Sequence, residues 1–384
     1  MKKIKVYCVL FDTLPLIDKI VSLSNENNLQ ILRQIGSCWT VSSCIQLLTG
    51  KMPSDLHNHG IGYMLEKKFK HLRHPITKKI DWPWKKQILL YQLLKHNWKV
   101  RYHSDSLFPK YIFQDISIKI SSGCNKHKKE YLVDIGSNGR KVMEKENKFI
   151  CQSQIEKNIK NVFYLIRYEH YHQALYYYGK NKKKFTKYLK IGMKKSLELM
   201  NRFDFDEPNS IFWFFSDHGD WNLQQDIRHP EPDMYYSWAL VKDNTENPIK
   251  INSKFISIGD FFPTIMDKFN YNYKPFLNID DKEITDTYSI EKEQDQNRIY
   301  YVEDARIKIN KYISTTAMAC KFVDWQNDKP RGILQVSYHS PDKKWKCFLT
   351  SLSEDGLFAI KPTKKNKMND DLRQKVIKRF KWAK

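Results

Sequence analysis

The sequence lacks a cysteine framework. Its seven cysteines are scattered, no two of them form a Cys-x-x-Cys pair, and their number is odd. A small fold stapled by disulfides is therefore not indicated, and the pattern is typical of free thiols in a reducing compartment.

Long apolar runs are missing as well. No stretch approaches the ~18 apolar residues that a membrane-spanning helix needs. The basic start of the chain carries only a short apolar run, which meets Asp12 without a small-residue cleavage site. This favours a first strand over a signal peptide. We therefore expect a soluble, cytoplasmic protein without a transmembrane segment.

Acidic residues are few relative to basic ones. Lys and Arg number 66 against 43 Asp and Glu, which gives a formal net charge of +23. Such an excess would suit an anionic substrate, nucleic acid or an acidic membrane. No specific nucleic-acid-binding module is recognisable, however, and lysine runs such as residues 180–187 are more typical of a solvated surface. The content of 41% hydrophobic and 14% aromatic residues over 384 positions predicts a globular protein with a large core.

Apolar runs of strand length indicate the interior of a sheet. Residues 4–11, 161–166 and 211–215 are rich in β-branched and aromatic residues, which predicts strands buried on both faces. Residues 188–203 have apolar side chains at helical spacing and join the second run to the third, so we expect a β-α-β unit with parallel strands. Further elements are predicted as strands at 98–103 and 235–241 and as helices at 84–98 and from about Asp260.

The pattern changes near residue 298. From there the sequence predicts four strands and a basic helix, at residues 298–302, 317–323, 332–338, 345–349 and 370–382. We therefore predict an α/β catalytic domain of residues 1–297, with a polar insertion at about 104–148. A smaller α+β lobe of residues 298–384 is expected to pack on it.

Titratable residues follow three of the predicted strands. Asp12 follows the first strand, Arg167 to His172 the middle one, and Asp217-His218 the third. In open α/β sheets, ligands bind at the carboxyl ends of the strands. For Asp217-His218 taken alone, a polar turn after a core strand explains the pair equally well.

A predicted helix at about residues 41–48, closed by Gly50 and Pro53, places Thr40 at its N-terminus. Free backbone N–H groups and the helix dipole favour an anion there. The alternative is that Thr40 is a plain N-cap, the commonest role of threonine before a helix.

Together these segments resemble the sulfatase-like branch of the alkaline phosphatase superfamily. In that branch a first strand ends in Asp, as in Phe11-Asp12-Thr13 here. A segment of the form Thr-x-x-Ser-x-x-x-Leu-Leu-Thr-Gly-x-x-Pro follows, matched by residues 40–53, and then Ser-Asp-His-Gly, matched by residues 216–219. Residues 257–265 are similar to the family's Asp-x-x-Pro-Thr helix. The resemblance covers roughly residues 4–270 and implies a large, mostly parallel central sheet sandwiched by helices.

The resemblance also implies a metal site and a nucleophile. Asp12, Asp217, His218 and the Thr40 oxygen would hold a divalent ion, and this donor set suits Mn, Zn, Ca or Mg. Thr40 would attack the substrate, since a bound metal activates a hydroxyl that is otherwise a poor nucleophile. The implied cycle forms a covalent phospho-enzyme and then transfers the group to water or to an alcohol.

Departures from the family pattern narrow the substrate. Formylglycine sulfatases carry Cys or Ser at the nucleophile position, with Pro and Arg two and four residues further on. Here these positions are Thr40, Ser42 and Cys44, and threonine cannot be converted to formylglycine. This favours phosphate monoesters or diesters. Two alternatives stay open on the same fold, a sulfuric ester hydrolase and a non-catalytic binding protein.

The number of metal ions is a second point of departure. Two-metal members have a His eleven residues after the Asp-His histidine, which His229 matches. They also have an Asp and a His five residues apart after the middle strand, and here this pair reads Arg167 and His172. Because arginine does not ligate metals, we favour one ion over two, with Arg167, His172 and His229 contacting the oxygens of an anionic ester substrate. The leaving group and the oligomeric state stay open.

Overall fold

A computed structural model describes the chain in segments. These are residues 3–37, 40–52, 88–104, 119–122, 161–172, 182–219, 236–252, 255–273, 287–291, 299–307, 313–321, 332–339, 344–352, 358–360 and 378–379. The chain forms two compact units. The first consists of Met1–Leu32, Leu72–Leu223 and Ser237–Pro248, and the second of Arg33–His71, Gln224–Tyr236 and Ile249–Lys384. Each unit is therefore assembled from segments that lie far apart in the sequence.

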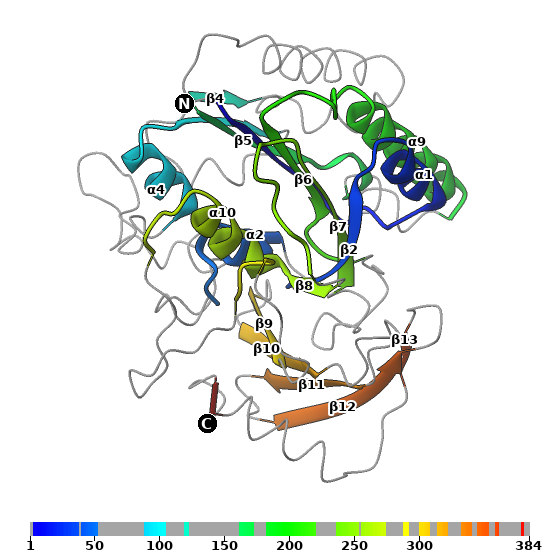
Figure 1. Cartoon of the computed structure of the whole chain (residues 1–384). Coiled ribbons are helices and arrows are strands. Elements are labelled where there is room, and N and C mark those ends of the chain that lie inside the picture. Colours follow the sequence, from blue (N-terminus) through cyan, green and yellow to red (C-terminus); the bar gives the residue numbers. More distant parts are fainter. Residues whose placement is uncertain are drawn as a thin grey trace, which may run out of the picture. The chain divides into compact units, whose positions relative to one another are not determined.

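The first unit is built on a mostly parallel sheet (Figure 1). Its strands follow the order β4 (Lys119–Ser122), β3 (Lys99–Ser104), β5 (Val162–Tyr168), β1 (Lys5–Phe11), β6 (Ser210–Ser216) and β7 (Tyr236–Asp243). Strand β1 pairs in parallel with both β5 and β6, and β3 pairs in parallel with β4 and β5. Only the β6–β7 pair of this unit is antiparallel among the pairings described.

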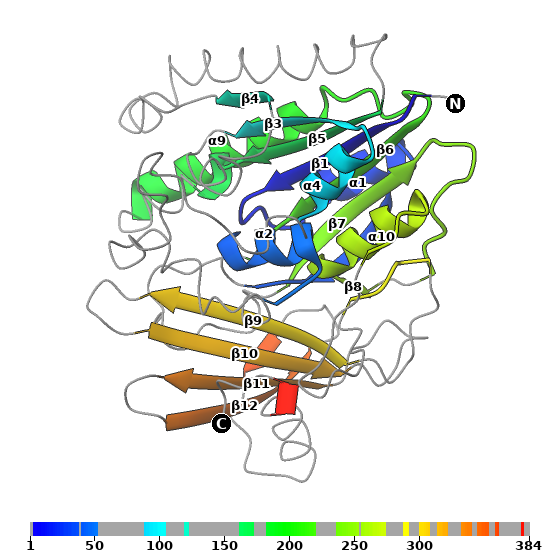
Figure 2. The same ribbon diagram turned by 90° about the vertical axis from the view of Figure 1, so that its left-hand side faces the viewer.

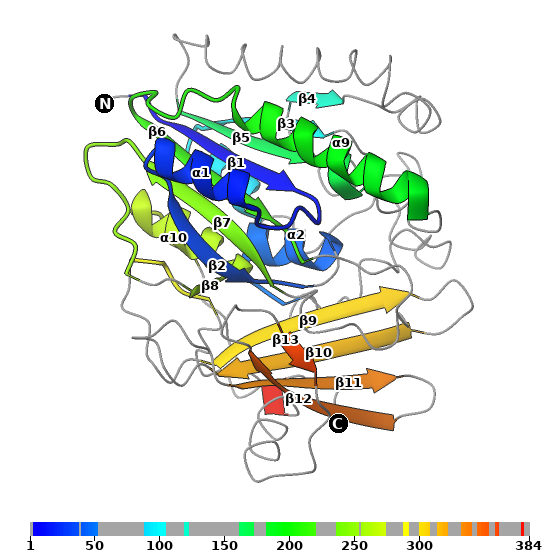
Figure 3. The same ribbon diagram turned by 90° about the vertical axis from the view of Figure 1, so that its right-hand side faces the viewer.

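Helices cover both faces of this sheet. The α1 helix (Asp18–Glu26) and the α9 helix (Lys182–Met200) lie on one face (Figure 3), and α4 (Leu89–Lys95) lies on the other. Strands β5 and β6 are buried along their whole length, as expected for strands covered on both sides. Leu199 and Met200 of α9 pack with the side chains of β1, β5 and β6 in one hydrophobic cluster.

Aromatic side chains form the centre of that cluster. Tyr7 of β1 stacks on Tyr164 of β5 with ring centroids 4.9 Å apart, and on Phe212 of β6 with centroids 5.1 Å apart. Phe203 meets the Tyr7 ring edge-on at 5.6 Å. Such offset and edge-to-face pairs stabilise beyond the area that they bury. The three central strands are therefore held in register by side-chain packing as well as by main-chain hydrogen bonds.

The predicted strands of this unit are confirmed, with two differences in detail. Strand β5 continues to Tyr168, so Arg167 lies inside the strand and not after it. Residues 119–122 fall within the segment predicted as an insertion, yet they form the edge strand β4 beside β3. Their sequence, Lys-Ile-Ser-Ser, is polar because an edge strand needs few apolar side chains, and this concealed it from a search for apolar runs.

In the second unit, β8 (Phe255–Ser257) pairs in parallel with the end of β2 (Gln30–Ile35). The short helix η5 (Ile258–Asp260) and α10 (Phe261–Lys268) follow, which confirms the helix predicted from about Asp260. Helix α2 spans Thr40–Thr49 and confirms the helix predicted at 41–48 within one residue at each end.

The Asp-x-x-Pro-Thr pattern has a structural explanation. The buried carboxylate of Asp260 accepts hydrogen bonds from the backbone N–H groups of Ser257 and Tyr288, at 2.8 and 2.9 Å. The Thr264 hydroxyl donates to the Asp260 carbonyl at 2.6 Å and accepts from Ile290 N–H at 3.0 Å. Ser257 and Asp260 thus form a capping box at the start of η5, and Asp260 and Thr264 fix the segment of residues 288–290 to the helices.

A second sheet of this unit is an antiparallel meander (Figure 2). It consists of β9 (Ile299–Ile307), β10 (Ile313–Lys321), β11 (Gly332–His339), β12 (Lys344–Leu352) and β13 (Phe358–Ile360). The four strands predicted beyond residue 298 are present, and β13 was not predicted. Of the predicted helix at 370–382, only residues 378–379 are described, and they are helical. The domain boundary near residue 297 stays a prediction.

Two further expectations concern absences. In the segments that the structure describes, no helix is long and apolar enough to cross a membrane. Among the described cysteines, Cys8 and Cys44 are buried and form no disulfide bond.

Gly192 permits a close approach inside the first unit. A Cβ atom at this position of α9 would lie 2.7 Å from the His170 carbonyl oxygen and 3.1 Å from the Tyr171 Cα. These neighbours are main-chain atoms of the short helical turn that follows β5 and includes His172. The helix can therefore lie against this turn only because residue 192 has no side chain.

Replacing Gly192 by Ala tests this packing. Alanine improves helix propensity by about 1 kcal/mol, but overpacking against main-chain atoms that cannot rotate away costs about 1–3 kcal/mol. Because the nearest main-chain atom would lie at only 2.7 Å, we take the upper part of this cost, about 2–3 kcal/mol, and expect G192A to lower the free energy of unfolding by roughly 1–2 kcal/mol in urea denaturation. Lys190→Ala, at an exposed position of the same helix, is the matched control and should leave stability nearly unchanged. A G192A variant as stable as the wild type would contradict the close contact.

Candidate metal centre

Two carboxylates come together because two parallel strands end side by side. Phe11 at the end of β1 is paired with Ser216 at the end of β6, so the next residues, Asp12 and Asp217, leave the sheet at the same edge. This arrangement follows from the strand pairing, because β1 and β6 are paired in parallel over seven positions and parallel strands share their carboxyl edge.

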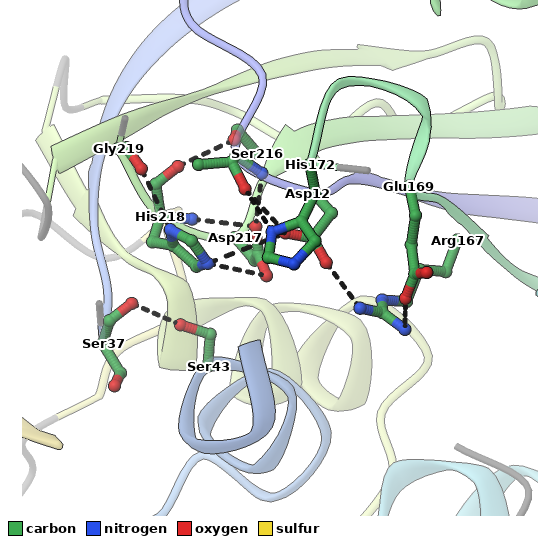
Figure 4. Close-up of polar contacts among 11 residues, drawn as sticks. Asp12, Ser37, Ser43, Arg167, Glu169, His172, Ser216, Asp217, His218 and Gly219 are labelled. Carbon is green, nitrogen blue, oxygen red and sulfur yellow. Dashed lines mark hydrogen bonds and ion pairs between the residues drawn. The ribbon is translucent and has the colours of Figure 1, made fainter. Parts of the chain in front are cut away.

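Asp12, Asp217 and His218 form a compact, buried cluster (Figure 4). One potential ligand atom from each lies within 4.8 Å of the other two. Their exposed fractions are 1%, 0% and 3%. The His218 Nε2 atom lies 3.7 Å from Asp12 Oδ1 and 3.6 Å from Asp217 Oδ2.

The orientation of His218 suits metal binding. Its Nδ1 atom lies 2.9 Å from the carbonyl oxygen of Gly219. Because a carbonyl oxygen only accepts, Nδ1 must carry the hydrogen of the neutral ring. Nε2 then presents its lone pair toward the two carboxylates. The main chain next to His218 therefore selects the tautomer that a divalent ion would require.

The residues present fit a divalent cation. Two carboxylates and one imidazole are a donor set that Mn, Zn, Ca or Mg accepts. Two buried carboxylates within a few ångströms also repel each other, and a cation between them would offset both charges. Asp12, Asp217 and His218, predicted from the sequence as ligands, therefore lie close enough to hold one ion, and their coordination of a metal stays a prediction.

Arg167 lies between two acidic side chains. Its Nη2 atom is 2.5 Å from Asp12 Oδ2, and its Nη1 atom contacts the carboxylate of Glu169. The guanidinium is nearly buried, and both of its terminal nitrogens are engaged by carboxylates (Figure 4). An arginine held in this way is a fixed positive charge beside Asp12.

His172 contacts the same carboxylate from another direction. Its Nδ1 atom lies 3.1 Å from Asp12 Oδ1. Burial lowers the pKa of His172, but the charge of Asp12 and a hydrogen bond to it, together with the charge of Glu169, outweigh burial and raise the pKa to about 9. Burial likewise raises the pKa of Asp12, and the nearby charges of His172, Arg167 and His218 outweigh it and hold that pKa well below its usual range.

The structure brings together most of the residues predicted for the site. Asp12, Arg167, His172, Asp217 and His218 all belong to the first unit and surround one point. Two other predicted residues are in other parts of the chain. Thr40 belongs to the second unit, and His229 lies outside the described residues.

Thr40 is the first residue of α2 and is 7% exposed. Within the same unit, the Ser43 hydroxyl of this helix donates to the Ser37 carbonyl at 2.8 Å (Figure 4). The predicted position of Thr40 at the start of a helix is therefore confirmed, whereas its role as nucleophile and ligand stays a prediction.

Two residues of the site were given no role from the sequence. Glu169 forms an ion pair with Arg167. Thr13 contacts Asp12, His172 and Asp217. Glu169 directly follows β5, and Thr13 is the second residue after β1. Their position after β5 and β1 was the only available signal, and it does not distinguish a functional side chain from a solvated one.

Comparisons with known proteins add the fold. Neither a protein-family model nor a curated protein sequence matches the chain. Solved structures do. An alkaline phosphatase superfamily protein from Vibrio parahaemolyticus has a TM-score of 0.59 and 11% identity, with 100% of this chain and 86% of that chain covered.

Two enzymes also share the architecture. The phosphonate monoester hydrolase of Agrobacterium radiobacter has a TM-score of 0.54 at 10% identity, and the aligned part covers 92% of this chain and 90% of the hydrolase chain. The lipoteichoic acid synthase LtaP from Listeria monocytogenes has a TM-score of 0.53 at 13% identity, and covers 99% of this chain and 90% of its own. At such low identity these similarities establish the architecture alone. The chain has the mixed α/β fold of the alkaline phosphatase and sulfatase proteins.

Proposed function

We propose that this protein is a metal-dependent hydrolase or transferase that acts on phosphate esters. The observation that carries the proposal is the buried cluster of Asp12, Asp217 and His218 at the carboxyl edge of the parallel sheet. The shared fold with a phosphonate monoester hydrolase and a lipoteichoic acid synthase supports the reaction class. The choice of phosphate over sulfate rests on threonine at position 40.

In this proposal Asp12, Asp217 and His218, with the Thr40 oxygen, hold one divalent ion. Bound there, the ion would supply Lewis acidity that neutralises charge on the transferring group and lowers the pKa of a hydroxyl. The protein's own contribution is to exclude water from these ligands and to hold them rigidly, since all three side chains of the cluster are buried.

Thr40 is the proposed nucleophile. The Thr40 oxygen would lose its proton and attack phosphorus, and the bond from phosphorus to the leaving alkoxide would break. The phosphoryl group of the resulting phosphothreonine would then pass to water or to an alcohol, which would regenerate Thr40. The position of Thr40 at the start of a ten-residue helix supports this role, because the first-turn N–H groups of α2 favour an anionic group. The assignment rests on the sequence motif of residues 40–53 and on this position.

One metal ion is proposed, not two. Arg167 stands where a second acidic ligand would be needed, and its guanidinium is already paired with Asp12. Because an arginine does not ligate a metal, a second ion would lack this ligand. Arg167 and His172, with His229, are proposed to bind the oxygens of the transferring group.

Metal binding is the first test. Purified protein loaded with Mn²⁺ or Zn²⁺ should hold about one ion per chain, measured by elemental analysis after gel filtration. Asp217→Asn keeps the shape of the side chain and removes its charge, so we expect at least a ~10-fold loss of affinity in titration calorimetry. Asp204→Asn, at an exposed position, is the matched control and should bind as the wild type does. A wild-type chain that binds neither ion would refute the metal centre.

The nucleophile is tested by turnover. With p-nitrophenyl phosphate, bis-p-nitrophenyl phosphate and p-nitrophenyl sulfate as substrates, we expect chelator-sensitive release from a phosphate ester. Because Thr40 is also a proposed ligand, turnover is compared at saturating metal concentration. There Thr40→Ala should lower kcat by at least ~10³-fold while the protein stays folded, as measured by its melting temperature. Thr40→Ser keeps the hydroxyl and should retain measurable activity.

Other outcomes would support the alternatives. Release from the sulfate ester alone would contradict phosphate transfer by threonine. A binding protein on this fold would be favoured by two observations together. The protein would bind metal but turn over none of the three esters, and Thr40→Ala would not affect any function found later.

A further inference from the structure

Thr13 has an unusual backbone conformation for its residue type. Its φ angle is +61°, in the left-handed region, and its side chain is fully buried. The other non-glycine residues with positive φ in the described segments are all asparagines, which tolerate this region well. A β-branched residue does not, so something in the fold must hold Thr13 in a conformation that it disfavours.

Two hydrogen bonds from Thr13 reach two different carboxylates. Its backbone N–H donates to Asp217 Oδ1 at 3.0 Å, and its hydroxyl donates to Asp12 Oδ1 at 2.7 Å. The φ angle sets the direction of a side chain relative to the N–H of the same residue. The left-handed conformation therefore lets a single residue bridge these two acids.

The Thr13 hydroxyl also organises the contact with His172. Its oxygen lies 3.1 Å from His172 Nδ1. Because the hydroxyl hydrogen is directed to Asp12, the oxygen can act as acceptor toward the ring. Thr13 thus contacts two proposed metal ligands, Asp12 and Asp217, and also His172.

The turn around Thr13 is anchored from both sides. The Asp12 N–H donates to the Tyr168 carbonyl of β5 at 2.9 Å, and the indole N–H of Trp238 donates to the Leu14 carbonyl at 2.7 Å. These bonds fix the backbone without contacting either carboxylate. They supply the support that an unfavourable φ angle at residue 13 requires.

We infer that Thr13 is a positioning residue, which holds the Asp12 and Asp217 carboxylates in the orientation in which they bind the metal ion. The inference rests on the proposed metal centre and assigns to Thr13 no contact with substrate. A plain turn residue would need neither a β-branched side chain nor a hydroxyl at this position, and glycine or asparagine would adopt the same φ angle more readily.

Direct titration of the chelator-treated protein with Mn²⁺ distinguishes a residue that positions the two carboxylates from a residue that only forms the turn. Thr13→Val keeps the shape and the branching but removes the hydroxyl, and should lower Mn²⁺ affinity by about 10- to 100-fold, as loss of an outer hydrogen bond to a ligand does. Thr13→Ser retains the hydroxyl and should stay within about threefold of wild type. If T13V does not fold, Thr13→Ala removes the same hydroxyl from a smaller side chain and carries the same expectation.

Trp238→Phe is the matched control for a purely structural effect. It removes the donor to the Leu14 carbonyl and so weakens the same turn without contacting a carboxylate. We expect a lower melting temperature with Mn²⁺ affinity nearly unchanged.

Either of two results would overturn the inference while leaving the proposed function intact. In the first, T13V binds Mn²⁺ as tightly as the wild type. In the second, T13V and W238F both lose Mn²⁺ affinity in proportion to the fall in their melting temperatures. A wild-type protein that binds no Mn²⁺ or Zn²⁺ would instead overturn the metal centre, and the role of Thr13 with it.

Discussion

The burial of two neighbouring carboxylates is the constraint on which the site depends. Asp12 and Asp217 have essentially no exposed surface, and an unpaired buried charge is strongly destabilising. Cations and hydrogen-bond donors from adjacent strand ends compensate these two buried charges. Arg167 and His172 face Asp12, while the N–H groups of Thr13 and His218 both donate to Asp217 Oδ1. Each compensating group comes from a strand end or from the residues that follow it, so the arrangement exists only while β1, β5 and β6 keep their register.

That register is secured far from the site. At the opposite end of β1, Lys5 and Tyr7 both bind the carboxylate of Glu207, at 2.5 and 2.8 Å. Glu207 lies just before β6, so this contact couples the starts of the two strands. A slip of one residue would turn every side chain of β1 to the other face of the sheet and carry Asp12 away from Asp217. The distance between the two acids is therefore set by packing at the amino edge as much as by groups at the carboxyl edge.

Much of this could be predicted because strands buried on both faces are apolar runs and the polar residues that follow them are conspicuous. Asp12, Asp217 and His218 were found in this way, and their clustering follows from parallel pairing. The edge strand β4 was not predicted, because its side chains are mostly polar. Thr13 escaped for a different reason: a backbone angle leaves no trace in the pattern of residue types, and threonine is among the residues least expected at a positive φ. The ion pair of Arg167 with Glu169 requires side-chain geometry that spacing alone cannot supply.

The interleaving of the chain has a consequence for its synthesis. Strand β1 is made first, yet Lys5 pairs with Val162 on one side and with Ser210 on the other. During translation, β1 therefore emerges with both edges unsatisfied and remains so until β5 and then β6, which begins at Ser210, have been made. Strands in that state pair readily with other chains, and late long-range closure slows folding. The centre of the finished sheet is thus the part of the nascent chain most in need of protection by chaperones.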